Sequence, residues 1–446
     1  MAFRDIRKSR RWLSAEEFRF LAFSLLALIL LLAVNITLAR RLPGGEWLFL
    51  RWSGARAFLA AQSDAEAEGQ KFGRTMPGGS PVMLVDTSQP YGTEIARMTQ
   101  EVAYGRLAFS SEYSYILNDP FPFVLFYIPL ALLHDFSIVR GIWALLSQAA
   151  LVATVLFGIS LSEWQPPRWM YVALLIFGLS SFFSLNAIAT GSPTAILVLL
   201  YAWILIALRS STDELAGGLL ALVAYQWEVG SLFFLFVLLF AIHNRRWGVL
   251  TGLAMALFIM LVVSFMIDPN WTLPYIRAVL SGWLRGATLT FGQILLTWLP
   301  NSELPLGNIV SIGLGLLLFV EWVAAVNAHF RRVVWAACLS LAATPLIGFA
   351  IFPSNHVVLL LPFILILTLA WERWRRQRVF FTLAIFLLVL LIPYGLYLRS
   401  VFIYDPLVTS LIAVLPPIAA IFGLYWMRWW VQRSPRTWFD QAGAYR

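Results

Sequence analysis

The sequence predicts an all-α membrane protein, folded as a polytopic bundle of transmembrane helices. Of its 446 residues, 60% are hydrophobic and only 12% are charged, and the mean hydropathy is +0.78. Soluble domains carry about 25% charged residues. Apolar runs of the length that crosses a bilayer, roughly 20 residues, recur along nearly the whole chain. A soluble multidomain protein is therefore excluded, and we expect a single transmembrane domain over residues 1–446.

The basic residues indicate how the chain is oriented. The net charge is +9, but the arginines gather at the ends of apolar runs, as the positive-inside rule describes, so we expect no nucleic-acid partner. The basic clusters lie at 245–246, 331–332, 373–378 and 428–436. They alternate with less basic turns near Asp268, Pro353 and Asp405. This pattern predicts a multi-pass protein of the cell membrane, with both termini cytoplasmic and the long first loop outside.

The first apolar run, Phe18–Ala39, is a retained span and not a signal peptide. A basic tail precedes it, as in signal peptides. However, the run is too long for a signal h-region. It also ends in Arg40 and Arg41 instead of a cleavage site made of small residues. We therefore expect the first helix to stay in the membrane.

Residues 40–119 form a long polar loop that holds a large share of the acidic residues. Within it, Glu46–Ala61 mixes tryptophans, leucines and arginines, which is typical of a helix lying in the membrane interface with its arginines towards phosphates. Its alternative role is that of an anchor only. Asp64–Val85 is Gly-rich and charged, which predicts a flexible segment. Tyr91–Gly105 predicts a short amphipathic helix, with Thr93 as its N-cap.

The remaining apolar runs predict the other spans. Leu215–Ala241 is interrupted by Gln226-Trp227-Glu228, so it is either one long helix or two shorter ones. In total we expect about twelve spans. The runs beyond the first span, with the interrupted one included, are Phe121–Leu133, Val139–Leu161, Tyr171–Leu185, Ala195–Leu208, Leu215–Ala241, Trp247–Ile267, Leu306–Val326, Val333–Phe352, His356–Trp371, Phe380–Leu398 and Leu407–Met427.

Several polar residues interrupt these runs. A charged group at the centre of a span costs about 2.5–3.5 kcal/mol, so it is a candidate functional residue. Glu228 lies beside the possible helix break and either lines a cavity or pairs with a neighbouring helix. Glu321 lies near a predicted cytoplasmic end and can simply reach the interface. The full set is Asn35, Asn186, Gln226, Glu228, Glu321, Asn327 and His356.

No metal or nucleotide motif accompanies these residues. The four histidines are scattered, and the sequence contains no HExxH, no paired cysteines and no Walker loop. Cys338, the single cysteine, lies within an apolar run, as core packing predicts. We therefore expect no cofactor and no bound metal.

What the sequence does offer is a set of carboxylates and arginines in the loop expected outside the membrane. A carboxylate can take the proton of an acceptor hydroxyl while arginines stabilise a departing lipid phosphate. A phosphate leaves readily once its charge is neutralised, so this group transfer needs no separate general acid. The alternative is that these charges are an ordinary solvated surface.

The order of short motifs resembles a known enzyme family. The resemblance is to the polyprenyl-phosphate-sugar-dependent glycosyltransferases of glycosyltransferase family 87, and it spans most of the chain. Its motifs are Pro43-Gly44-Gly45-Glu46, Trp52-Ser53-Gly54-Ala55-Arg56-Ala57-Phe58-Leu59, Pro90-Tyr91, Tyr104-Gly105-Arg106, Gly191-Ser192-Pro193-Thr194, and the run from His356 to Pro362.

The resemblance implies a GT-C type fold and a single inverting displacement on the outer face. The donor would be a polyprenyl-phosphate sugar, such as a mannose donor, and the acceptor a lipid or a glycan among the membrane lipids. The family's catalytic acid falls on Glu46 or Trp47, depending on one gap, and Glu46 is the expected base, with Asp119 as the second candidate. The other expected site residues are Arg51, Arg56 and His356 for the donor phosphate, and Asn118, Tyr115 and Glu228 as the cavity lining.

Besides the uncertain alignment at Glu46, the sequence departs from this family at two further places. The family's Tyr-Pro-Pro is replaced by Asn118-Asp119-Pro120-Phe121-Pro122, and a basic residue of the sixth-span region by Gln226-Trp227-Glu228. These changes leave open an altered donor specificity or an inactive relative.

Two further hypotheses compete with the transferase. A lipid-linked saccharide carrier or flippase, without covalent chemistry, predicts a continuous polar path that contains Glu228 and Asn186. A membrane scaffold predicts that Glu46 and Asp119 face bulk water.

Overall fold

The computed structural model describes residues 15–66, 90–109, 112–285, 289–300, 305–373, 377–403 and 406–431. Regular structure within these ranges is helical, and the one β pairing within them is an isolated bridge between Thr290 and Ala350. The all-α prediction is therefore confirmed for the described residues. The termini, whose side of the membrane the charge pattern predicts, lie largely outside these ranges.

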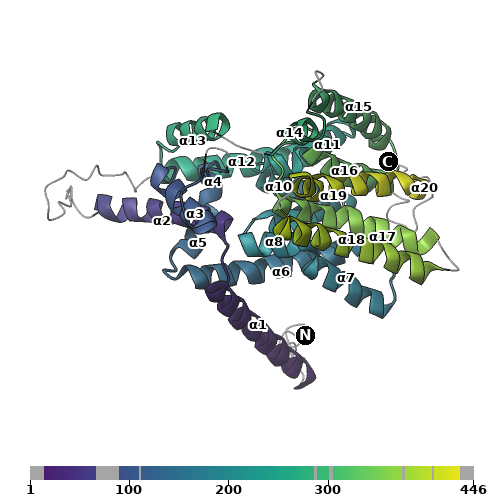
Figure 1. Cartoon of the computed structure of the whole chain (residues 1–446), viewed down its shortest axis with the longest axis horizontal. Coiled ribbons are helices and arrows are strands. Elements are labelled where there is room, and N and C mark those ends of the chain that lie inside the picture. The colour runs from purple at the N-terminus through teal and green to yellow at the C-terminus, as the bar shows by residue number, and fades with distance from the viewer. Residues whose placement is uncertain are drawn as a thin grey trace, which may run out of the picture.

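The first half of the chain contains the helices of the predicted long loop and the first spans (Figure 1). Its elements are α1 (Ala15–Arg41), α2 (Glu46–Glu66), α3 (Thr93–Tyr104), α4 (Phe121–Val124), η1 (Leu125–Tyr127), α5 (Ile128–Ala131), α6 (Phe136–Leu161), α7 (Arg168–Ser180), α8 (Phe182–Thr190), α9 (Thr194–Arg209), α10 (Asp213–Val223) and α11 (Trp227–His243).

The second half completes the bundle, and α2 and α20 lie at opposite ends of its long axis (Figure 1). Its elements are α12 (Trp247–Ile267), α13 (Thr272–Arg285), α14 (Phe291–Trp298), α15 (Leu306–Val326), α16 (Phe330–Ala343), η2 (Thr344–Leu346), η3 (Pro353–Leu359), α17 (Leu360–Arg373), α18 (Arg378–Phe402), α19 (Pro406–Trp426) and α20 (Arg428–Val431).

Seven of the described helices are long and apolar enough to cross a membrane, or eight if the bent pair α7 and α8 is one span. The protein is therefore a multi-pass helical membrane protein. Shorter apolar helices over Phe121–Ala131, Thr194–Arg209 and Trp227–His243 accompany them. The expected total of about twelve spans stays a prediction, because it depends on whether these shorter helices also cross.

Two apolar runs break where the sequence carries helix-breaking residues. The predicted span Phe121–Leu133 is divided into α4, η1 and α5, and Pro129 near the start of α5 cannot donate a backbone hydrogen bond. The run Leu215–Ala241 ends as two helices, α10 and α11, separated by residues 224–226. Of the two alternatives for that run, the one with two helices is therefore confirmed.

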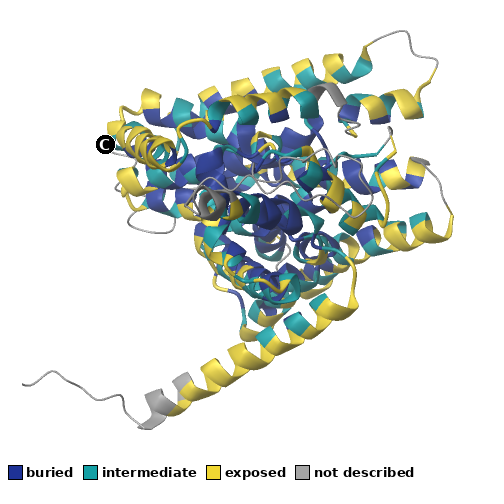
Figure 2. Cartoon of the chain, turned by 90° about the vertical axis from the view of Figure 1, so that its left-hand side faces the viewer, coloured by how far each residue is buried: buried dark blue, intermediate teal, exposed yellow. Residues whose placement is uncertain are grey.

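Burial separates the centre of the bundle from its periphery. In α17 and the turn before it, 89% of the apolar window is buried, against 6% in α1 and 11% in α12. Figure 2 shows α1 as an almost wholly exposed helix beside a buried interior. Exposed leucines and phenylalanines are unfavourable in water but favourable against lipid tails. The outer helices therefore carry the lipid-facing surface, while α16 and α17 form the interior.

Glycines allow the closest helix crossings. A Cβ on Gly217 of α10 would lie 2.1 Å from the carbonyl oxygen of Val249 in α12, and one on Gly141 of α6 would lie 2.4 Å from Ile36 of α1. Membrane helices gain most of their association energy from such tight packing, since burial from lipid adds little.

The predicted loop helices form, but α2 is packed more deeply than expected. It begins at Glu46 as predicted and runs to Glu66. Leu48, Leu50 and Ala55 are at most 1% exposed, within a second apolar core that also includes Phe121 and Trp143. This part of α2 is therefore a buried element of the fold and does not lie on the surface as a membrane-interface helix.

The details of the other loop segments differ from expectation as well. The N-cap of α3 is Gly92, without a side-chain cap, and Thr93 is the first helical residue. The expectation that Thr93 caps this helix is therefore wrong by one residue. Most of the segment Asp64–Val85, expected to be flexible, lies outside the described residues.

Gly191 provides a test of this packing, with Gly105 as its matched control. Both have left-handed backbones, with φ of +71° and +69°, but an added Cβ meets Leu48 at 2.6 Å in Gly191 and nothing within 4 Å in Gly105. We expect Gly105→Ala to lose about 1–2 kcal/mol from backbone strain alone. Gly191→Ala should lose clearly more in thermal unfolding of the purified protein. Equal losses would contradict the contact between α2 and the turn before α9.

Candidate functional site

The site begins at a sharp turn between α1 and α2. Gly44 and Gly45 both have positive φ, at +118° and +87°, and a Cβ on Gly44 would lie 2.7 Å from the carbonyl oxygen of Ala189. Only glycine adopts such backbone angles without strain and allows this close approach. The turn therefore places Glu46 as the first residue of α2, directly beyond the end of the first span.

Arg140 of α6 holds this turn in place. Its guanidinium donates hydrogen bonds to the carbonyl oxygens of Leu42 at 2.7 Å and Pro43 at 2.8 Å, and longer ones to Ala39 at 3.3 Å and Ala189 at 3.2 Å. The residue is only 9% exposed. One buried cation therefore links the end of α1, the turn before Glu46 and the end of α8.

The Glu46 carboxylate lies partly buried at the N-terminus of α2. Burial raises its pKa above the ordinary value for glutamate, and the backbone amides of Glu46 and Gly45 together with the charge of Arg140 oppose this rise. A carboxylate with a raised pKa is a stronger base than an ordinary one. The residue that the sequence names as base is therefore in an environment that favours proton uptake.

A group of aromatic residues lies next to Glu46 and is called the aromatic cluster below. Its five members are Trp47, Tyr104, Tyr113, Tyr115 and Phe352. The ring centroid of Trp47 lies 5.3 Å from that of Tyr113, 5.2 Å from Tyr115 and 5.1 Å from Phe352. Tyr104 contacts Tyr115 at 5.7 Å. After burial, the charge of Glu46 is the next cause that raises the pKa of Tyr115. The carboxylate and the aromatic cluster therefore belong to one site.

The segment that carries Tyr113 and Tyr115 is held in an unusual conformation. Tyr115 has a φ of 48°, which is rare for a residue other than glycine and indicates a constrained site. Two side chains of α3 hold the segment, because Gln100 donates a hydrogen bond to the carbonyl of Ser114 at 2.7 Å and Tyr104 donates one to that of Tyr113 at 3.3 Å. The helix α3 thus orients the aromatic cluster.

Arg51 and Asp119, to which the sequence assigns separate roles, form one buried ion pair. Arg51 Nε lies 2.6 Å from Asp119 Oδ2, and the two side chains are 4% and 6% exposed. A second contact joins Arg51 Nη2 to Asp119 Oδ1 at 3.2 Å, and Tyr91 donates a hydrogen bond to the Asp119 backbone carbonyl. Each charge is neutralised by the other, so Arg51 binds a phosphate only if it leaves Asp119.

Glu228 is the second residue of α11. The charges of Arg51 and Asp119 both influence the protonation of the Glu228 carboxyl group. Burial raises the pKa of Tyr113, and the nearby charge of Glu228 adds to this rise. Tyr113 itself packs on Trp47, Tyr115 and Phe352 of the aromatic cluster. Asn118, the other expected lining residue, is exposed beside Asp119.

The remaining two expected phosphate ligands lie outside the aromatic cluster. Arg56 stacks on Trp52, with its guanidinium carbon 4.9 Å from the ring centroid. His356 is 1% exposed and bonds through Nε2 to the carbonyl oxygen of Ala413 at 2.7 Å. Its ring packs against Phe183 at 5.3 Å. In this structure the His356 side chain therefore ties η3 to α19.

The predicted helix break at Gly191–Thr194 is linked to the site through Asn355, which lies three residues after Phe352. Thr194 donates a hydrogen bond to Asn355 Oδ1 at 3.2 Å, and Phe352, three residues earlier, belongs to the aromatic cluster. The break at Gly191–Thr194 and the residues before His356 thus position one wall of the site. That wall is built by Phe352 and Asn355.

Sequence reasoning missed Arg140 and, apart from Tyr115, the members of the aromatic cluster. Arg140 is a charge within an apolar run, so the criterion that selected Glu228 would also have found it. Trp47 and Phe352 are 305 positions apart in the numbering, and nothing in a single sequence shows that they meet. Within the described ranges, no group of three His, Cys, Asp or Glu residues could hold a metal ion.

The buried pair provides a stability test. We expect Asp119→Asn to destabilise the protein by about 3–5 kcal/mol, because it leaves the Arg51 charge buried without a partner. The double variant Arg51→Met with Asp119→Asn removes that charge and should recover a large part of the loss. Thermal unfolding of the purified protein in detergent measures both. A double variant no more stable than Asp119→Asn would show that the buried charge is not the cause.

The site thus combines a partly buried carboxylate, a set of aromatic faces and a neutralised ion pair at the α2 end of the bundle. Comparisons of the chain with protein-family models, with curated proteins and with solved structures find no match.

Proposed function

We propose that the protein is a membrane glycosyltransferase, which moves a sugar from a polyprenyl-phosphate donor to a hydroxyl of a lipid or glycan acceptor. The observation that carries this proposal is Glu46, a carboxylate with a raised pKa, next to the aromatic cluster around Trp47. The site lies at the end of the bundle that the charge pattern predicts to be outside. The resemblance of the motifs to glycosyltransferase family 87 supports the same activity.

The aromatic cluster suits a sugar. Sugar rings have apolar faces made of C–H groups, which pack on the flat faces of tryptophan and tyrosine, while their hydroxyls need hydrogen-bond partners around the rim. Trp47 supplies aromatic surface, and Tyr104 and Tyr115 add hydroxyl groups to the same cluster, of which that of Tyr104 donates to the Tyr113 carbonyl. Aromatic residues with a polar tip can contribute both kinds of contact.

The reaction is a single displacement at the anomeric carbon. Glu46 takes the proton of the acceptor hydroxyl, and the acceptor oxygen forms the new bond to the anomeric carbon. The bond from that carbon to the phosphate oxygen breaks at the same time. Its electron pair leaves with the polyprenyl phosphate, and the configuration of the sugar inverts.

Arg56 is the expected phosphate ligand with the most available charge. Arg51 is already paired with Asp119, and Arg140 is engaged by four backbone carbonyls. Among the described residues no carboxylate pairs with Arg56, which stacks on Trp52 and makes one long contact, at 3.5 Å, to the carbonyl of His134. A cation that is not neutralised can stabilise the charge of the leaving phosphate.

The competing hypotheses find less support. A carrier needs a polar path between the two ends of the bundle, but the described interior is filled by a large apolar core that includes Tyr201, Phe233 and Trp335. A scaffold predicts carboxylates in bulk water, whereas Asp119 is 5% exposed and Glu46 is partly buried.

Replacing the proposed base tests the mechanism. We expect Glu46→Gln to lower the transfer rate about 10²–10⁴-fold, the usual contribution of a general base. The matched control is Glu101→Gln on the exposed face of α3, which should keep the wild-type rate. Mass analysis of the lipid products formed in membranes from a panel of polyprenyl-phosphate sugars measures the rate. Equal turnover of Glu46→Gln and wild type would refute the assignment of the base.

The pH dependence of transfer follows from the raised pKa of Glu46. The base acts only when it is deprotonated, so kcat/KM should fall as the pH falls through this pKa. Because burial raises the pKa, the decline should begin at a higher pH than for an ordinary glutamate, whose pKa is about 4.3. The residual activity of Glu46→Gln should lack this acidic limb. A wild-type profile that stays flat down to the ordinary value would argue against Glu46 as the base.

A further inference from the structure

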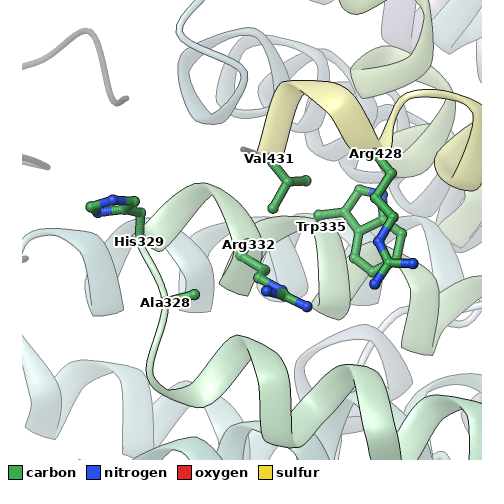
Figure 3. Close-up of a pocket in the computed structure, with 6 residues that line it drawn as sticks. All are labelled: Ala328, His329, Arg332, Trp335, Arg428 and Val431. Carbon is green, nitrogen blue, oxygen red and sulfur yellow. The ribbon is translucent and has the colours of Figure 1, made fainter. Parts of the chain in front are cut away.

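A second polar site lies at the opposite end of the bundle. A pocket of about 480 Å³ is lined by Ala328, His329, Arg332, Trp335, Arg428 and Val431 (Figure 3). Its polar side chains come from the start of α16 and from α20. Such a volume is within the range of small-molecule sites, roughly 300–1,000 Å³. The glycosyltransferase proposal uses none of these residues.

The two arginines of the pocket, Arg332 and Arg428, both pair with one buried carboxylate. Glu321 of α15 is 4% exposed, and it lies 2.9 Å from Arg428 Nη2 and 3.5 Å from Arg332 Nη2. The side chain of Arg332 is 28% exposed, and that of Arg428 is 47% exposed. The carboxylate does not line the pocket, so the surface presented to a ligand is cationic. Two guanidinium groups on one carboxylate also leave one positive charge uncompensated.

The surroundings place the pocket at the level of lipid headgroups. Tryptophan and arginine gather at membrane interfaces, and at this end Arg373 lies over the rings of Trp426 at 5.1 Å and Trp429 at 5.7 Å. Arg331 lies over Trp430 at 5.0 Å. The basic clusters at 331–332 and 428–436 also predict that this end is cytoplasmic.

We propose that this pocket binds an anionic phosphate group, supplied by a phospholipid headgroup or by a soluble phosphate compound. Arg332 and Arg428 each present a planar set of N–H donors that matches phosphate oxygens. His329 lines the pocket with its ring pointing away from the two guanidinium groups (Figure 3), and Val431 and Trp335 supply an apolar side. The Glu321 carboxylate fixes the two guanidinium groups in advance, which lowers the entropy lost on binding.

The test is a binding titration of the purified full-length protein with three probes: inorganic phosphate, a short-chain phosphatidic acid, and a short-chain phosphatidylcholine as the zwitterionic control. We expect saturable binding of an anionic probe and weaker binding of the zwitterionic lipid. Binding of inorganic phosphate identifies a soluble phosphate as a sufficient ligand, whereas binding of phosphatidic acid alone identifies a lipid headgroup.

The variants must not leave Glu321 buried without a partner, because an unpaired buried charge destabilises the fold. The triple variant Glu321→Gln, Arg332→Gln, Arg428→Gln removes all three charges together, and His329→Gln changes the rim without affecting the ion cluster. We expect the triple variant to raise the apparent Kd for the anionic probe about tenfold or more, the loss of at least one charge-assisted hydrogen bond. His329→Gln should raise it by less.

The matched control is Arg168→Gln, an exposed arginine at the start of α7 that does not line the pocket. It should bind the anionic probe as the wild type does. Failure of the wild type to bind either anionic probe, or unchanged binding by the triple variant, would overturn the proposal.

Discussion

The arrangement at the α2 end depends on the buried guanidinium of Arg140. It donates to backbone carbonyls at the end of α1, in the turn before α2 and at the end of α8. Buried carbonyls need hydrogen-bond partners, and a sharp turn built from Pro43, Gly44 and Gly45 cannot supply them internally. One side chain thus satisfies the turn and fixes the position of Glu46. Its positive charge also limits how far burial raises the pKa of that carboxylate.

Two other buried arginines among the described residues are each paired with a carboxylate. Arg51 pairs with Asp119, and Arg331 with Glu163. An unpaired charge inside such a fold would be far more costly than a paired one. The charges in the described interior therefore support the fold first. The two proposals rest on charges whose pairing is incomplete, namely Glu46 and the two arginines that share Glu321.

The sequence predicts the parts of this structure that depend on local pattern. The apolar runs Trp247–Ile267 and Leu306–Val326 coincide with α12 and α15, and Gln226-Trp227-Glu228 does mark the break between α10 and α11. The sequence also predicts the helix start at Glu46 and the glycine turn before it. The contacts between distant segments were not predictable, because Arg51 meets Asp119 across 68 residues and Phe352 meets Trp47 only after the bundle has folded. For the same reason, the mixture of aromatic residues and arginines in α2 predicts a membrane-interface helix, whereas the structure buries this part of α2.

In the proposed function, the aromatic cluster beside Glu46 holds the sugar of a polyprenyl-phosphate donor. The most direct measurement is an experimental structure of the protein with a non-transferable donor analogue, a polyprenyl phosphonate sugar. The account predicts the sugar ring packed on Trp47, with its anomeric carbon facing the acceptor position next to the Glu46 carboxylate. A sugar bound elsewhere, for example inside the bundle beside Glu228 and away from Trp47, would contradict it.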